Sequence, residues 1–159
     1  MIKAISFKGY SDSQIQLKKA GLALVNIALN DPDFEAAWLK ESCTETNGMT
    51  QLQVLNKLRE YQEIEFRAYR SRWSKVIGYF ISGDVLWDNL KYIDQYDAVE
   101  SSSNDIHETA HIKGFSHYGA WETSVPYSLN RVYEKWAYAY LAAKQAQAQP
   151  VEATPACPV

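Results

Sequence analysis

The sequence predicts an α+β fold, in which a small mixed and twisted sheet is backed by helices. Two observations predict it: apolar residues recur at helical spacing over residues 12–29 and 127–146, whereas residues 64–69 alternate between apolar and polar side chains. The length of 159 residues suits one domain with one core. We therefore expect a single domain over residues 1–146 and a flexible tail over residues 147–159, which is rich in Ala, Gln and Pro.

Helices dominate the expected structure of the first third of the chain. Ser11 and Gln14 have the spacing of a capping box, which indicates the start of a helix. Thr50 is a suitable cap for another helix. The expected elements in this region are a strand over residues 2–7, a helix over 12–29, a short helix over 34–42, a polar loop over 44–48 and a helix over 51–62.

The middle of the chain is expected to supply the other strands, followed by a loop and a final helix. The strands are predicted around residues 64–69, 76–81 and 85–93, from period-two alternation and compact apolar runs. Residues 100–105 are polar and are expected to form a loop, from which Ser103, Asn104 or Asp105 caps the next helix. Pro126 suits the beginning of the last helix, expected over residues 127–146.

The most informative segment is residues 107–117, which read H-E-x-x-H-x-x-G-x-x-H. The chain has three histidines, and all of them fall in this segment. Histidine is the commonest side-chain metal ligand, so their concentration at fixed spacing favours a metal site. An amphipathic helix with ordinary surface histidines is the alternative, but it gives no reason for the positions of Gly114 and His117.

The spacing of these residues suits one catalytic Zn²⁺ ion. His107 and His111 lie four residues apart, which places both imidazoles on one face of a helix. Gly114 readily adopts the left-handed conformation that ends a helix, so the chain can turn and bring His117 back to the same ion. Three imidazoles leave one position of a tetrahedral zinc open, as catalytic sites require. Glu108 is then placed to activate the zinc-bound water as general base and to return the proton to the leaving amine.

This motif resembles the extended zinc-binding signature of the metzincin metallopeptidases. The resemblance implies that His107, His111 and His117 bind the zinc and that Glu108 is the catalytic base. It also implies a turn at Gly114 between an upper part, residues 1–114, and a short lower part, residues 115–146, that ends in a C-terminal helix.

The chain departs from this family below the expected metal. Metzincins carry a methionine turn downstream of the third ligand, whereas Met1 and Met49 both lie upstream. The nearest substitute is residues 124–127, Ser-Val-Pro-Tyr, where Val125 and Pro126 would give an apolar floor. Tyr127 would approach the metal or stabilise the oxyanion, or it would only pack at the start of the last helix.

In this family an edge strand above the metal pairs with the substrate, which implies an extended peptide or protein as partner. The candidate edge strand is residues 76–81 or, second, residues 85–93. Gly78 and Gly83 would permit close approach of another backbone. The function expected is therefore zinc-dependent peptide-bond hydrolysis by an endopeptidase.

Two other readings stay open. One is a catalytically silent zinc-binding module that acts through protein–protein interaction, and the other is an interaction protein with an aromatic-rich surface in which the motif is incidental. The retained Glu108 favours the enzyme, because a structural zinc site needs no carboxylate there.

The remaining expectations concern partners and compartment. A net charge of −3 argues against a nucleic-acid partner. There is no apolar run of 18 residues, so we expect no membrane span. We also expect a monomer. No signal peptide is recognised, which fits a cytoplasmic protein or one exported with a leader that this sequence does not include. Cys43 and Cys157 are either free thiols or a disulfide that holds the tail.

Overall fold

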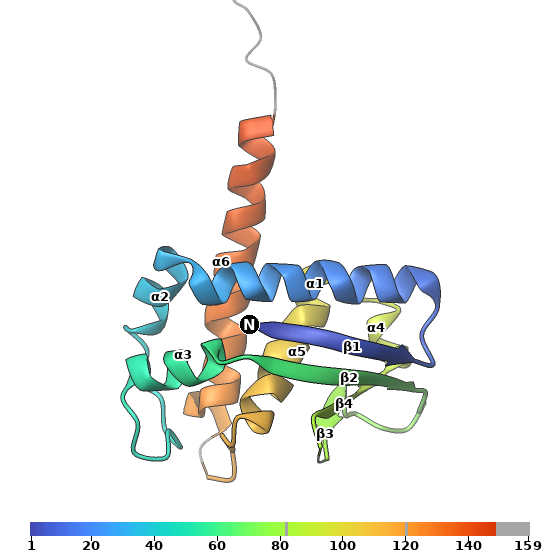
Figure 1. Ribbon diagram of the computed structural model, residues 1–159, viewed down its shortest axis with the longest axis horizontal. Coiled ribbons are helices and arrows are strands. Elements are labelled where there is room, and N and C mark those ends of the chain that lie inside the picture. The colour runs from blue at the N-terminus through green and yellow to red at the C-terminus, as the bar shows by residue number, and fades with distance from the viewer. Residues whose placement is uncertain (82, 120, 149–159) are drawn as a thin grey trace, which may run out of the picture.

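The chain has an α+β fold with a small mixed sheet, as predicted (Figure 1). The computed structural model describes residues 1–81, 83–119 and 121–148. Within these residues the helices are α1 (Asp12–Asn30), α2 (Pro32–Trp38), α3 (Gln51–Arg59), α4 (Leu90–Ile93), α5 (Ala98–Ile112) and α6 (Val125–Ala148), with a 3-10 turn, η1, over Trp121–Thr123.

The sheet of the described chain has four strands: β1 (Ile2–Lys8), β2 (Gln62–Tyr69), β3 (Gly78–Phe80) and β4 (Val85–Asn89). Their order is β1-β2-β4-β3, with β1, β2 and β4 parallel and β3 antiparallel to β4. The strand predicted around residues 76–81 is therefore at an edge of the sheet. The second candidate, β4, lies in the interior and has no free edge.

The core lies between the sheet and the helices. Buried side chains of β2 and β4, such as Ile64, Phe66 and Leu86, face α1 and α5, which pack against each other. Residues 51–62 were expected to be one helix, but α3 ends at Arg59 because Gln62 already pairs with Ile2 of β1. Both predicted capping boxes, at Ser11 and Thr50, are present.

The prediction of a polar loop over residues 100–105 is wrong. Helix α5 begins at Ala98 and is capped by Asp97, whose side chain forms a capping box with Glu100. The serines of this segment are buried, and their size lets α5 approach α1 closely. A Cβ atom added to Gly21 of α1 would lie 2.7 Å from the Ser102 Cβ atom. The polar composition here reflects close helix packing, not exposure to solvent.

Two more boundaries differ from the expectation. The segment 85–93 is not one strand, because β4 ends at Asn89, whose side chain caps α4. Helix α6 begins at Val125, two residues before the predicted start, and its C-terminal half projects beyond the rest of the molecule (Figure 1). It continues to Ala148, so residues 147 and 148 belong to a helix and not to a tail.

The other tail residues, 149–159, lie outside the described residues. Cys157, the alternative disulfide partner of Cys43, lies among them. Among the helices of the described chain, none has the length and apolar character needed to cross a membrane.

Candidate metal centre

The three histidines converge at the C-terminal end of α5. His107 and His111 lie on one face of the helix, and the chain then turns at Gly114, whose φ of +88° is left-handed, to bring His117 back. One ligand atom from each histidine lies within 4.8 Å of the other two. The Nε2 atoms of His107 and His111 are 3.2 Å apart. Two nitrogens on one tetrahedral zinc, each at about 2.0–2.1 Å, are about 3.3 Å apart, so this geometry suits a single ion.

The surroundings of two histidines favour the neutral imidazole that a metal needs. The Nδ1 of His111 lies 2.7 Å from the carbonyl of Phe115, which accepts its hydrogen and leaves the Nε2 lone pair directed toward the other histidines. Burial, together with the neighbouring imidazoles, lowers the pKa of His107 to about 3. Burial also lowers the pKa of His111.

The start of α6 lies against the histidines, through the Pro126 backbone and the Tyr127 ring. Val125 is fully buried and Pro126 is buried beside it. The Nδ1 atom of His107 is buried and forms no hydrogen bond of normal geometry. The Pro126 carbonyl and the Asn130 side chain lie near it and act to raise the pKa of His107, against the larger effect of burial. The Asn130 amide donates to the carbonyls of Ser103 and Pro126 at 2.9 and 3.3 Å. Asn130 could not be identified from the sequence, because helical spacing alone does not show which residue of α6 faces the site.

Glu108 lies at the wall of the same site and is only 5 % exposed. Burial raises the pKa of its carboxyl to about 8, and the charges of Asp88 and Asp105 act in the same direction, whereas a hydrogen bond from the Phe80 backbone opposes the shift. A carboxyl with a pKa near neutrality can both accept and release a proton under physiological conditions.

Tyr127 lies beside the histidines, with its ring centroid 4.8 Å from that of His107 and 5.2 Å from that of His117. Trp121 of η1 stacks on Tyr127 at 5.5 Å and contacts His117 at 5.0 Å. It is 60 % exposed and was not singled out by the sequence. Burial raises the pKa of Tyr127, and the charge of Glu108 adds to this effect, so its hydroxyl keeps its proton.

A cleft runs between the histidines and the edge strand β3. It consists of two hollows of about 620 and 450 Å³, which share Val76, Gly78, Glu108 and His117 as lining residues. The larger hollow is lined further by apolar and aromatic side chains, including Phe80, Ile81, Phe115 and Tyr118. The smaller one is bordered by Lys75, Asn104, Trp121 and Tyr127.

The two glycines near this cleft have other reasons to be glycine than the one expected. A Cβ atom on Gly78 would lie 2.4 Å from the Asn104 side chain, so its small size serves internal packing. Gly83 has a φ of +66° in the turn between β3 and β4. Neither observation requires a ligand backbone at these positions.

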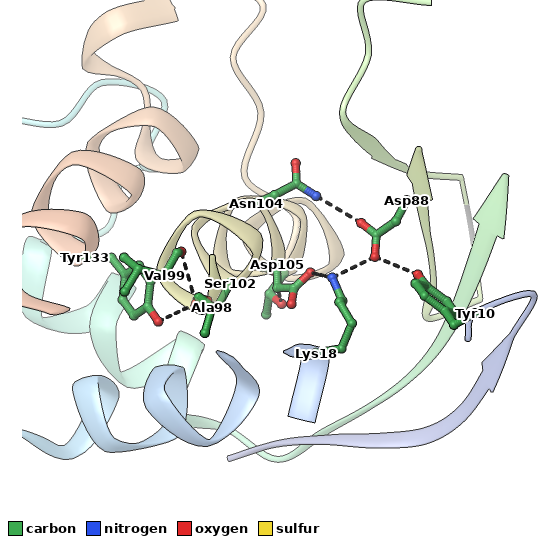
Figure 2. A network of polar contacts seen from close by, with 10 residues as sticks. Tyr10, Lys18, Asp88, Ala98, Val99, Ser102, Asn104, Asp105 and Tyr133 are labelled. Atoms are coloured by element: carbon green, nitrogen blue, oxygen red, sulfur yellow. Dashed lines mark hydrogen bonds and ion pairs between the residues drawn. The ribbon is translucent and has the colours of Figure 1, made fainter. Parts of the chain in front are cut away.

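A buried polar cluster connects α1, β4 and α5 (Figure 2). The Lys18 ammonium forms ion pairs with Asp88, at 2.6 Å, and with Asp105, and all three side chains are excluded from solvent. Asp88 also accepts hydrogen bonds from the hydroxyl of Tyr10 at 2.6 Å and the amide of Asn104 at 3.2 Å. Asp105 is two residues before His107, so this cluster fixes α5 against the sheet.

No family model, curated protein or solved structure matches this chain. The site is therefore defined by its own geometry. Three histidines lie close enough together to hold one metal ion, with a buried carboxyl group and an open cleft beside them.

Proposed function

We propose that this protein is a zinc-dependent endopeptidase whose site resembles that of the metzincins. The observation that carries the proposal is the meeting of three elements at one cleft: the histidine cluster, the buried Glu108 and the edge strand β3. A structural zinc site would need neither the carboxyl group nor the cleft. Val125 takes the place of the family's methionine as apolar floor in this proposal.

The chemistry follows from the residues around the cleft. A zinc ion bound by the three histidines would lower the pKa of a water molecule to about 7 and polarise the substrate carbonyl. Glu108, at the wall of the cleft beside the histidines, would accept the proton of the attacking water and pass it to the nitrogen of the leaving amine. Tyr127 keeps its hydroxyl proton and donates it as a hydrogen bond to the oxygen on which negative charge develops.

The substrate would be a peptide or protein segment in extended conformation. β3 leaves one side of its backbone unpaired by the sheet, and an added strand obtains main-chain hydrogen bonds from such an edge. The two hollows would receive side chains on either side of the bond that is cleaved, with the larger hollow suited to an apolar one.

The test combines zinc content with cleavage of a library of quenched peptides. The Glu108→Gln variant keeps the size of the side chain and all three proposed zinc ligands, so we expect one zinc per chain as in the unmutated protein. Removal of the base is expected to lower kcat by about 10²–10⁴-fold.

The matched control is Glu63→Gln, the same change on an exposed carboxylate of β2 that pairs with Lys3. It should leave both zinc content and cleavage unchanged. Full activity in Glu108→Gln would contradict the role of this residue, and zinc binding without cleavage of any peptide would favour a silent zinc-binding module.

A further inference from the structure

The loop of residues 44–48, here named the clasp loop, holds the segment that carries the third histidine. At one end the Thr44 backbone N–H donates to the Thr123 carbonyl at 2.8 Å, just before α6 begins. At the other end the Asn47 side-chain amide donates to the Gly114 carbonyl at 2.9 Å, at the turn after α5. The clasp loop therefore contacts the ligand segment where it starts and where it ends.

Between these contacts, the carboxylate of Glu45 binds the residues on both sides of His117. It accepts hydrogen bonds from the Ser116 hydroxyl at 3.0 Å, the Tyr118 backbone N–H at 3.0 Å and the Gly119 backbone N–H at 2.6 Å. Hydrogen bonds to a charged acceptor are stronger than those between neutral groups. One side chain, 72 positions earlier in the sequence, thus fixes the backbone that presents the ligand.

The backbone of the clasp loop is itself unusual. Glu45 has a φ of +57° and Asn47 a φ of +56°, in the left-handed region that non-glycine residues seldom adopt. Such conformations persist when the surrounding structure imposes them, and they gather at functional sites. Here the left-handed turn directs the Glu45 carboxylate to the three donors around His117.

We propose that Glu45 is a positioning residue for the third metal ligand, an inference that rests on the metal site of the proposed function. His107 and His111 are held by α5, but His117 lies outside the helix. Without Glu45, residues 116–119 would have to be ordered when the metal binds, which weakens the affinity. The hydrogen bonds of Glu45 given above hold the segment on both sides of His117, so we expect its loss to act on metal affinity.

The experiment measures zinc affinity by competition with a chromogenic chelator. Loss of a group that orients a ligand typically weakens metal affinity by about 10–100-fold, and we expect this for Glu45→Ala. Glu45→Gln keeps one acceptor oxygen but turns its NH₂ group toward backbone donors, so a smaller loss is expected. Glu63→Ala, on the exposed face of β2, is the matched control and should bind zinc as the unmutated protein does.

A second background separates positioning of His117 from a general structural role. In the His117→Ala protein, which has lost the third ligand, Glu45→Ala should change zinc affinity by less than about threefold. If Glu45 acts only by positioning His117, its effect disappears when that histidine is absent, so the two substitutions are not additive. An equal loss in both backgrounds would overturn the inference. Unchanged affinity in both Glu45 variants would overturn it too, while leaving the metal site intact. If the unmutated protein binds no zinc, the proposed function fails and this inference with it.

Discussion

At the scale of single residues, removing the hydroxyl group of Tyr127 distinguishes a packing role of this side chain from a catalytic one. The ring packs against His107, His117 and Trp121, and a phenylalanine would keep those contacts. We expect Tyr127→Phe to bind zinc normally and to lose about 10²–10³-fold in kcat, the usual cost of removing one donor to an oxyanion. Steady-state kinetics with a cleaved peptide give the answer.

Trp121→Phe is the companion variant, because it alters the stacking partner of Tyr127 without removing a hydroxyl group. It should change KM more than kcat, since Trp121 borders the smaller hollow. A kcat for Tyr127→Phe equal to that of the unmutated protein would assign Tyr127 to packing alone.

The histidines and Glu108 could be predicted because their chemistry depends on short, fixed spacings along one helix and one turn. Trp121, Asn130 and Glu45 could not be predicted in the same way. Each contacts the site through the tertiary fold, and Glu45 lies 72 positions before His117. Nothing in the local sequence of the clasp loop distinguishes Glu45 from the other polar residues of a solvated loop.

At the scale of elements, α5 shows how composition can mislead. Its serines predict a loop, since small polar residues favour turns. In the structure the Ser102 hydroxyl donates to the Ala98 carbonyl at 2.6 Å and lies 2.6 Å from the Tyr133 hydroxyl (Figure 2). The hydrogen bond to the helix's own backbone satisfies the serine hydroxyl, so the side chain can be buried. Its small volume permits the close approach of α1.

The contact between α1 and α5 makes Gly21 a sensitive position. Alanine is the better helix former by about 1 kcal/mol, so Gly21→Ala would stabilise an isolated helix. Here the new methyl group would lie 2.7 Å from the Ser102 Cβ atom and 3.0 Å from the Ala98 carbonyl oxygen. Overpacking of this kind costs about 1–3 kcal/mol, and we expect net destabilisation in urea unfolding.

The control for Gly21→Ala is Lys19→Ala, an exposed position on the same helix. It should change the free energy of unfolding by less than about 0.5 kcal/mol. A Gly21→Ala protein that is more stable than the unmutated one would show that α1 and α5 are less tightly packed than described.

At the scale of the whole molecule, the α+β class could be predicted from periodicity, but the strand order could not. The edge strand was expected among residues 76–81 or 85–93 from the family resemblance, and only the fold shows that β3 is at an edge while β4 is interior. Parallel pairing of β1, β2 and β4 depends on contacts between segments up to about 60 residues apart, which no local pattern encodes. The same holds for the buried cluster of Lys18, Asp88 and Asp105, because its members lie on α1, β4 and α5.

Substitutions in this cluster test how strongly it holds α1 and α5 to the sheet. Burial by itself lowers the pKa of Lys18, but the adjoining carboxylates of Asp105 and Asp88 outweigh it, so the ammonium stays charged. In the described chain, both Asp88 and Asp105 form their ion pair with Lys18 alone, and Lys18→Met removes this shared cation. Breaking a buried pair costs about 3–5 kcal/mol, because an uncompensated charge is left inside.

We therefore expect Lys18→Met to lose about 3–5 kcal/mol in urea unfolding of the metal-free protein, with the exposed Lys19→Met unchanged as control. The double variant Lys18→Met/Asp105→Leu should recover part of this loss. It removes one of the two stranded carboxylates, and the other, Asp88, still accepts hydrogen bonds from Tyr10 and Asn104. If the double variant were less stable than Lys18→Met, the two charges would not be coupled, and the cluster would not act as the unit that fixes α5 to the sheet.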